Sequence, residues 1–136
     1  MNKTAKLLIS WFTGGIIYFY MEIAFRGYSH YSMLICGGIC FVLVGSAGSR
    51  ILKNESRKIV MLAKIMLAGA FIITCMEFIT GIIVNIIFKL DVWDYSALRY
   101  NVMGQICLLY SGLWANLSLL CVYITRVMNK YIYQEE

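Results

Sequence analysis

The sequence has no proline and few charged residues, and both shortages restrict the class of protein that it can encode. Its 136 residues include one histidine, and only 14% of them are charged. A soluble domain carries about 25% charged residues, whereas 61% of this chain is apolar and its mean hydropathy is +0.75. This composition indicates an integral membrane protein rather than a soluble domain.

Residue types that commonly form catalytic and metal sites are also scarce. His30 is the single histidine, and none of the five cysteines belongs to a CxxC pair. A zinc site therefore lacks its usual ligands, and we expect the cysteines to act as small apolar packing residues. No nucleophile and base form a recognisable arrangement, so we expect no enzyme, no metal and no cofactor.

Four stretches contain the roughly 20 apolar residues that a membrane-spanning helix requires. They cover approximately residues 7–25, 31–48, 59–88 and 101–125. In lipid the backbone groups must be hydrogen-bonded within each segment, which favours helices. We therefore predict an all-α integral membrane four-helix bundle that forms one transmembrane domain over residues 1–136 and contacts the lipid bilayer.

The net charge of +5 comes from basic residues in short segments between the apolar stretches. These residues form no continuous basic arm, so we expect no nucleic-acid partner. Nine of the twelve lysines and arginines fall on one side of the predicted membrane, while Arg26, Lys89 and Arg99 fall on the other. This excess predicts a multi-pass protein of the cytoplasmic (inner) membrane with both termini in the cytoplasm.

Residues 45–58 are predicted to form the main cytoplasmic loop. The segment contains Arg50, Lys53, Arg57 and Lys58. Contact with anionic lipid, which would fix the topology, explains these charges. Docking of a cytoplasmic partner is the alternative explanation.

Two glutamates lie inside predicted membrane helices, where ionisable residues are costly and commonly functional. Glu22 has Arg26 one helical turn away, which predicts an ion pair with a structural role. Glu77 has no basic residue within a turn, so it needs a partner from another helix, a bound cation or a proton. Together with Asn101 and Gln105 these residues form our candidate polar site in the outer half of the bundle, and helix packing is their alternative role.

The two glutamates also occur in similar local sequences. The shared order is Met-Glu, then Tyr-Ser, then a glycine shortly before Ile-Cys, at residues 21–22, 31–32 and 38–40 in the first half and 76–77, 95–96 and 104–107 in the second. The spacing is wider in the second half, so duplication and chance both explain the pattern. A duplication predicts two tandem helical hairpins related by a pseudo-two-fold axis along the membrane normal.

One run of residues resembles the signature of a known family. The run comprises Trp93-Asp94-Tyr95-Ser96, Asn101, Gly104-Gln105-Ile106-Cys107, Ser111 and Trp114. It resembles the ABC-transporter permease family called type IV or CmpB-like, with this chain as a small four-helix bacterial member. The first half is similar through Tyr18, Glu22, Arg26-Gly27 and Tyr31-Ser32, but it lacks the proline-containing turn that follows Arg-Gly in many members.

The resemblance implies a membrane transport component, a permease for an unidentified small solute or ion. The chain has no GxxxxGK[ST] phosphate-binding loop, so ATP-driven transport would require a separate cytoplasmic ATPase. Four helices are too few to enclose a pathway, so we expect a homo-oligomer, with a dimer favoured. The alternatives are a proton-coupled exporter of small cations and a non-transporting structural membrane subunit.

Overall fold

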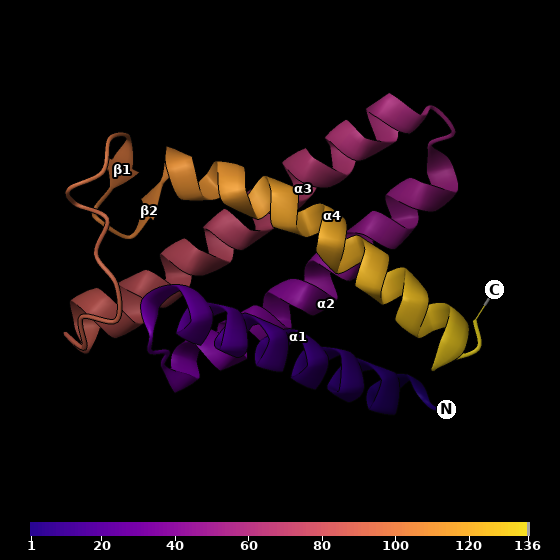
Figure 1. Ribbon diagram of the computed structural model, residues 1–136, viewed down its shortest axis with the longest axis horizontal. Helices are drawn as coiled ribbons and strands as arrows, with labels where there is room; N and C mark the ends of the chain where they lie inside the picture. The colour runs from indigo at the N-terminus through magenta and orange to yellow at the C-terminus, as the bar shows by residue number, and fades with distance from the viewer. Residues whose placement is uncertain (136) are drawn as a thin grey trace.

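The computed structural model describes residues 1–135, which form a bundle of four long helices (Figure 1). The elements are α1 (Lys3–Arg26), α2 (Tyr31–Asn54), α3 (Lys58–Gly81), the π-helix η1 (Ile82–Ile87), β1 (Asn101–Val102), β2 (Ile106–Cys107) and α4 (Leu108–Tyr131). The spans α1, α2, α3 with η1, and α4 are each long and apolar enough to cross a membrane. The predicted all-α membrane bundle is confirmed.

The connections between the helices alternate between the two ends of the bundle (Figure 1). Both termini and the α2–α3 turn lie at one end, and the α1–α2 turn and the segment from η1 to α4 lie at the other. The termini also contact each other, because the Tyr133 hydroxyl donates to the backbone oxygen of Lys6 at 3.0 Å. The cytoplasmic location of this end stays a prediction.

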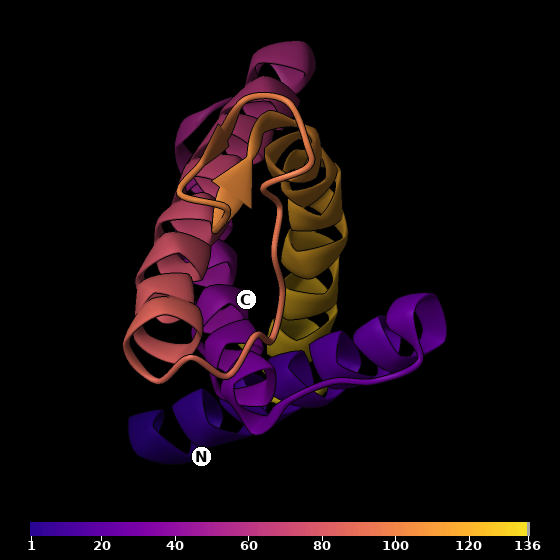
Figure 2. The same ribbon diagram turned by 90° about the vertical axis from the view of Figure 1, so that its left-hand side faces the viewer.

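The helices form two hairpins, α1–α2 and α3–α4, and α2 contacts all three of the other helices. α1 packs on α2 and α3 packs on α4, while α2 also contacts both α3 and α4. Figure 2 shows α1 lying across one side of the bundle, away from the pair formed by α3 and α4. The same view shows the segment between η1 and α4 passing across the end of the bundle opposite the termini. We call this segment, residues 88–107, the outer segment, after the predicted topology.

Glycines allow the helices to approach closely. Gly14 of α1 lies directly against the Phe41 side chain of α2, and Gly69 of α3 lies against Ser118 of α4. A β-carbon at either glycine would overlap these neighbours. Close approach through small residues is the usual basis of helix association in membranes, where lipid removes most of the hydrophobic driving force.

The fourth helix begins at Leu108, so the predicted start at residue 101 was wrong. The Asn101 side chain instead stabilises a turn, since its amide donates to the Leu98 carbonyl at 2.8 Å and its oxygen accepts the Gly104 N–H at 3.1 Å. Gly104 has a left-handed backbone with a φ of 71°. These local bonds compete with helix formation, and the chain forms the short β1–β2 hairpin before α4.

The predicted loop at residues 45–58 is mostly helical, because α2 continues to Asn54 and leaves only three residues before α3. Gly45 and Gly48, which lie in this predicted loop, instead belong to α2 and pack against α4. The remaining turn is held by Glu55, which accepts hydrogen bonds from Arg57 at 3.1 Å and Lys64 at 2.8 Å.

These bonds, with Arg57 the larger cause, lower the pKa of Glu55 to about 2. A carboxylate whose pKa is lower in the folded state stabilises that state once it is ionised. Its contribution is therefore complete above a pH of about 4.5, the ordinary pKa, and is lost as the pH falls through about 2. The turn is expected to keep its ion pairs at all physiological pH values.

The close α3–α4 contact predicts that Gly69→Ala destabilises the bundle. The added methyl group would overlap the fully buried Ser118, and overpacking of this kind lowers the free energy of unfolding by about 1–3 kcal/mol. Gly112→Ala is the matched control, since Gly112 lies on the exposed face of α4 with nothing near its missing β-carbon. Thermal unfolding in detergent measures both, and equal unfolding temperatures would contradict the prediction.

Candidate functional site

Glu77 points into the bundle and is only 3% exposed. One carboxylate oxygen accepts a hydrogen bond from the Tyr95 hydroxyl at 2.7 Å, and the other accepts one from the Trp114 indole N–H at 3.0 Å. Both donors are neutral, and no salt bridge reaches Glu77 from any of residues 1–135. Of the partners considered for this acid, the structure supplies donors from another helix and from the outer segment.

Glu22 has a different environment. Its two oxygens accept hydrogen bonds from the Tyr18 hydroxyl at 2.9 Å and from Arg26 at 2.8 Å. Glu22 and Arg26 therefore form the ion pair expected from their spacing, and the guanidinium balances the carboxylate charge. The two acids are not equivalent, because only Glu77 lacks a cationic partner.

The acids nevertheless occupy equivalent positions along their helices. Glu22 is the twentieth of the 24 residues in α1, and Glu77 is the twentieth of the 24 residues in α3. Each also accepts a hydrogen bond from a tyrosine hydroxyl. This correspondence supports the interpretation of two related hairpins, while a pseudo-two-fold axis stays a prediction.

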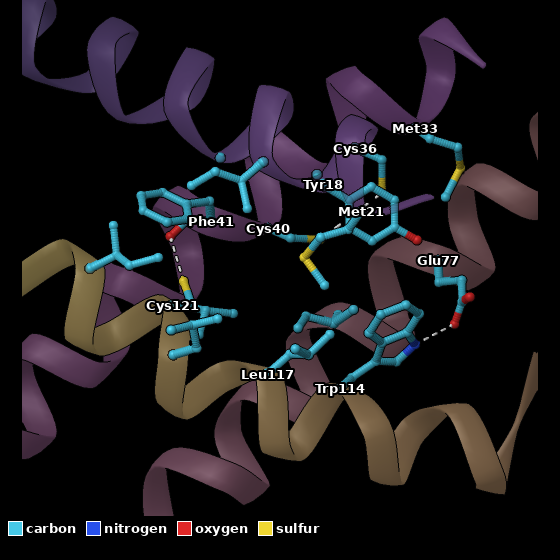
Figure 3. Close-up of a pocket in the computed structure, with 17 residues that line it drawn as sticks. Tyr18, Met21, Met33, Cys36, Cys40, Phe41, Glu77, Trp114, Leu117 and Cys121 are labelled. Atoms are coloured by element: carbon cyan, nitrogen blue, oxygen red, sulfur yellow. Dashed lines mark hydrogen bonds between the residues drawn. The ribbon is translucent and has the colours of Figure 1, made fainter. Parts of the chain in front are cut away.

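A cavity of about 100 Å³ lies between the four helices, and Glu77 is one of the residues that line it. Figure 3 shows Glu77 bonded to Trp114, with Tyr18 beside them. The rest of the lining is almost entirely carbon and sulfur. It includes Met21, Met33, Cys36, Cys40, Phe41 and Cys121. The cavity thus combines one carboxylate and three aromatic side chains, Tyr18, Phe41 and Trp114, with aliphatic and sulfur-containing walls.

Aromatic rings connect the outer segment to this cavity. Tyr95 stacks on Tyr110 with ring centroids 4.7 Å apart, and Tyr110 lies 6.1 Å from Trp114. The Trp114 ring lies 5.9 Å from that of Tyr18. This row of rings orients the two hydrogen-bond donors of Glu77 and joins α1, α4 and the outer segment.

Gln105 belongs to a separate buried cluster. Its side-chain oxygen accepts a hydrogen bond from Asn85 of η1 at 2.7 Å, and its backbone oxygen accepts the Trp93 indole N–H at 2.9 Å. The Asn85 side-chain oxygen in turn accepts the Val92 N–H at 2.7 Å. These bonds attach η1 and the segment after it to the β1–β2 hairpin that precedes α4.

The family-like motif builds the outer segment. Asp94 accepts the Ser96 N–H at 2.9 Å as well as its hydroxyl, and these bonds lower the pKa of Asp94. The Tyr95 N–H donates to the Gly104 carbonyl at 2.7 Å, and Trp93 is buried against the Gln105 cluster. The motif therefore holds Tyr95 in the position from which its hydroxyl reaches Glu77.

The five residues of our candidate polar site are thus found in three places. Glu22 and Arg26 form an ion pair, Glu77 lies at the cavity, and Gln105 and Asn101 shape the outer segment. Sequence reasoning did not identify Tyr18, Tyr95 and Trp114 as donors to the two acids. The Tyr18 contact could have been predicted, because Tyr18 precedes Glu22 by four residues and so lies on the same face of the helix. The donors to Glu77 come from distant parts of the chain.

The fold and the cavity define a small multi-pass membrane protein with a buried acid in its interior. Comparison with known families gives a match to the family described as "Putative ABC-transporter type IV" over residues 8–135. The chain belongs to this family of ABC-transporter-type membrane components, as its motif predicted. No curated protein and no solved structure was found to match it.

The Gln105 cluster predicts that Gln105→Ala loosens the outer segment. Removal of the side-chain amide leaves the buried Asn85 amide without its acceptor, a penalty of about 1–3 kcal/mol. Hydrogen exchange at the Val92 amide should then accelerate by about fivefold to a hundredfold.

Asn116→Ala is the control for this measurement, because the Asn116 amide bonds only to the Gly112 carbonyl on an exposed face of α4. The Val92 amide should exchange at the wild-type rate in this variant. An unchanged rate in Gln105→Ala would show that the cluster does not hold the segment in place.

Proposed function

We propose that this protein is a permease-type transport component for a small solute or ion, and that Glu77 is its solute-contacting group. The observation that carries the proposal is a carboxylate buried at a membrane-embedded cavity without a cationic partner. A residue that served packing alone would not require a charge in this position, since ionisable residues in hydrocarbon are costly. Membership of an ABC-transporter-type family supports a role in transport.

The segment from η1 to α4 would be the outer gate of this site. It covers the outer end of the bundle (Figure 2), and Tyr95 extends from it to the carboxylate. Four of its non-glycine residues have positive φ values: Lys89, Asp91, Tyr100 and Met103. Such backbone strain is commonly found in segments that switch between arrangements. A solute that replaced the Tyr95 hydroxyl at Glu77 would weaken the attachment of the gate.

We propose two partners for this chain, a cytoplasmic ATPase and a further copy of itself. ATP-driven transport would need a cytoplasmic ATPase, for which the exposed basic residues Arg50, Lys53, Arg57 and Lys58 at the α2–α3 turn offer an acidic partner a docking surface. The cavity between the four helices is small, about 100 Å³, and four helices are too few to form a pathway, so we propose a homo-oligomer, with a dimer favoured. In this proposal the turn and both termini face the cytoplasm from the cytoplasmic membrane.

A proton-coupled exporter of small cations is the second candidate. One observation favours it: Glu77 is the only acid among the residues lining the cavity, and a single carboxylate can be occupied by either a proton or a cation. The exporter would need no ATPase. A non-transporting structural subunit is the third outcome, in which the polar contacts serve assembly alone.

Flux measurements in liposomes test the proposal. We expect Glu77→Gln to reduce efflux of a radiolabelled cation panel, comprising rubidium, choline and tetramethylammonium, by roughly tenfold or more, since a contact with a charged group is lost. Glu135→Gln is the matched control, because Glu135 is exposed near the C-terminus and its carboxylate contacts Lys6, away from both the cavity and the α2–α3 turn. It should leave efflux unchanged.

The energy source separates the transport candidates. Flux that depends on ATP and on a copurified ATPase indicates a permease component, whereas flux driven by a pH gradient without an ATPase indicates the exporter. If no flux occurs under either condition, and Glu22→Gln and Glu77→Gln only dissociate the oligomer, the protein is a structural subunit and the transport proposal fails.

A further inference from the structure

We infer that the cavity beside Glu77 binds a small monocation whose charge is covered by carbon, such as a quaternary ammonium group. The inference rests on the proposed function for its role in transport, but the binding itself follows from the cavity. Three features support it: the charge of the site, the rings in its wall, and the shortage of hydrogen-bonding groups.

The charge of the site favours a cation. The Trp114 indole N–H can only donate, so the oxygen that it contacts acts as an acceptor, and the Tyr95 hydroxyl also donates to the carboxylate. Neither donor carries a positive charge. The nearby Glu22 is already paired with Arg26, so Glu77 is the acid left to attract a cationic ligand.

The aromatic rings favour a cation that carries alkyl groups. Tyr18 and Trp114 both line the cavity, and their ring centroids lie 5.9 Å apart. Tyrosine and tryptophan rings attract cations through their negative faces, most strongly in a site from which water is excluded, and quaternary ammonium groups are commonly bound in this way. Figure 3 shows both rings beside Glu77.

The walls disfavour a primary ammonium. Only Tyr18 and Glu77 have side-chain oxygens among the residues that line the cavity, and the Tyr18 hydroxyl donates to Glu22. A primary ammonium has three N–H donors, whereas the side-chain oxygen acceptors of the cavity are confined to Glu77, which already accepts two hydrogen bonds, and the Tyr18 hydroxyl. A methylated ammonium has no such need and buries its carbon against carbon and sulfur.

The size of the cavity limits the ligand. Its volume of about 100 Å³ is smaller than the roughly 150 Å³ of an apolar cavity that admits benzene. Met21 and Met33 are in the wall, and methionine side chains adapt readily to a ligand. Trimethylammonium and tetramethylammonium are therefore the expected size class, whereas larger organic cations would require the helices to separate.

Equilibrium dialysis of radiolabelled tetramethylammonium against the full-length protein in lipid nanodiscs tests the inference. We expect saturable binding that unlabelled tetramethylammonium displaces and that neopentyl alcohol, a neutral molecule of similar shape, does not. Glu77→Gln should weaken binding roughly tenfold or more, because it removes the negative charge that attracts the cation, while Glu135→Gln should leave it unchanged. Displacement by neopentyl alcohol, or no saturable binding, overturns the inference.

A pair of substitutions at Tyr18 separates the ring from the hydroxyl. Tyr18→Phe keeps the ring and should retain binding, whereas Tyr18→Leu should weaken it by about fivefold or more, because a desolvated ring–cation contact is lost. Tyr95→Phe removes a donor that competes for the carboxylate and should strengthen binding. These variants decide the question even if Glu77→Gln does not fold, and equal binding in Tyr18→Phe and Tyr18→Leu would contradict ring recognition.

The binding and flux experiments test the ligand class and the transport proposal separately. If tetramethylammonium binds but no solute crosses the membrane, the ligand class is correct and the transport proposal is wrong. If tetramethylammonium does not bind but flux of another solute depends on Glu77, the transport proposal is correct and the ligand class is wrong.

Discussion

The two hydrogen bonds accepted by Glu77 are the interaction on which the interior of this protein depends. They join α3 to α4 through Trp114 and to the outer segment through Tyr95. A buried carboxylate that lost either donor would retain its desolvation penalty without full compensation. The position of the outer segment, the orientation of the aromatic rings and the polarity of the cavity are therefore coupled at a single side chain. The same coupling would allow the solute proposed above to act on the outer segment.

Close backbone packing provides the support for this centre. The chain has no proline, and its membrane helices carry glycine at several contacts, including those of Gly14 and Gly69. Uninterrupted helices that approach through glycines form a rigid frame. α1 is the exception, because it packs mainly on α2 and contributes Tyr18 to the cavity from one side. The cavity thus lies between three helices that contact one another and a fourth that packs mainly on one of them.

Hydropathy alone predicted the four spans and the fold class, because long apolar runs have one stable form in lipid. Hydropathy missed two boundaries. The hydrogen bonds of the Asn101 turn delay the start of α4 to Leu108, and close packing of Gly45 and Gly48 on α4 accompanies the continuation of α2 to Asn54. The Glu22–Arg26 pair was predictable because both residues lie on one helix. The donors to Glu77 were not, since Tyr95 and Trp114 approach it across 18 and 37 residues of sequence. Such contacts depend on how helices and loops pack, which spacing along the chain does not encode.

The outer connections of the two hairpins differ greatly in length. This difference accompanies the different hydrogen-bond partners of Glu22 and Glu77. Only residues 27–30 join α1 to α2, whereas residues 82–107 lie between α3 and α4. If the halves arose from one ancestral hairpin, the added residues changed only one copy. The short connection left Glu22 with an arginine from its own helix, and the long one brought a tyrosine from outside the helices to Glu77. One copy of the ancestral acid would then have kept a permanent ion pair, and the other would have gained a neutral partner that a ligand can replace. In this account an insertion between the helices, and no change at the acids themselves, separated the two roles.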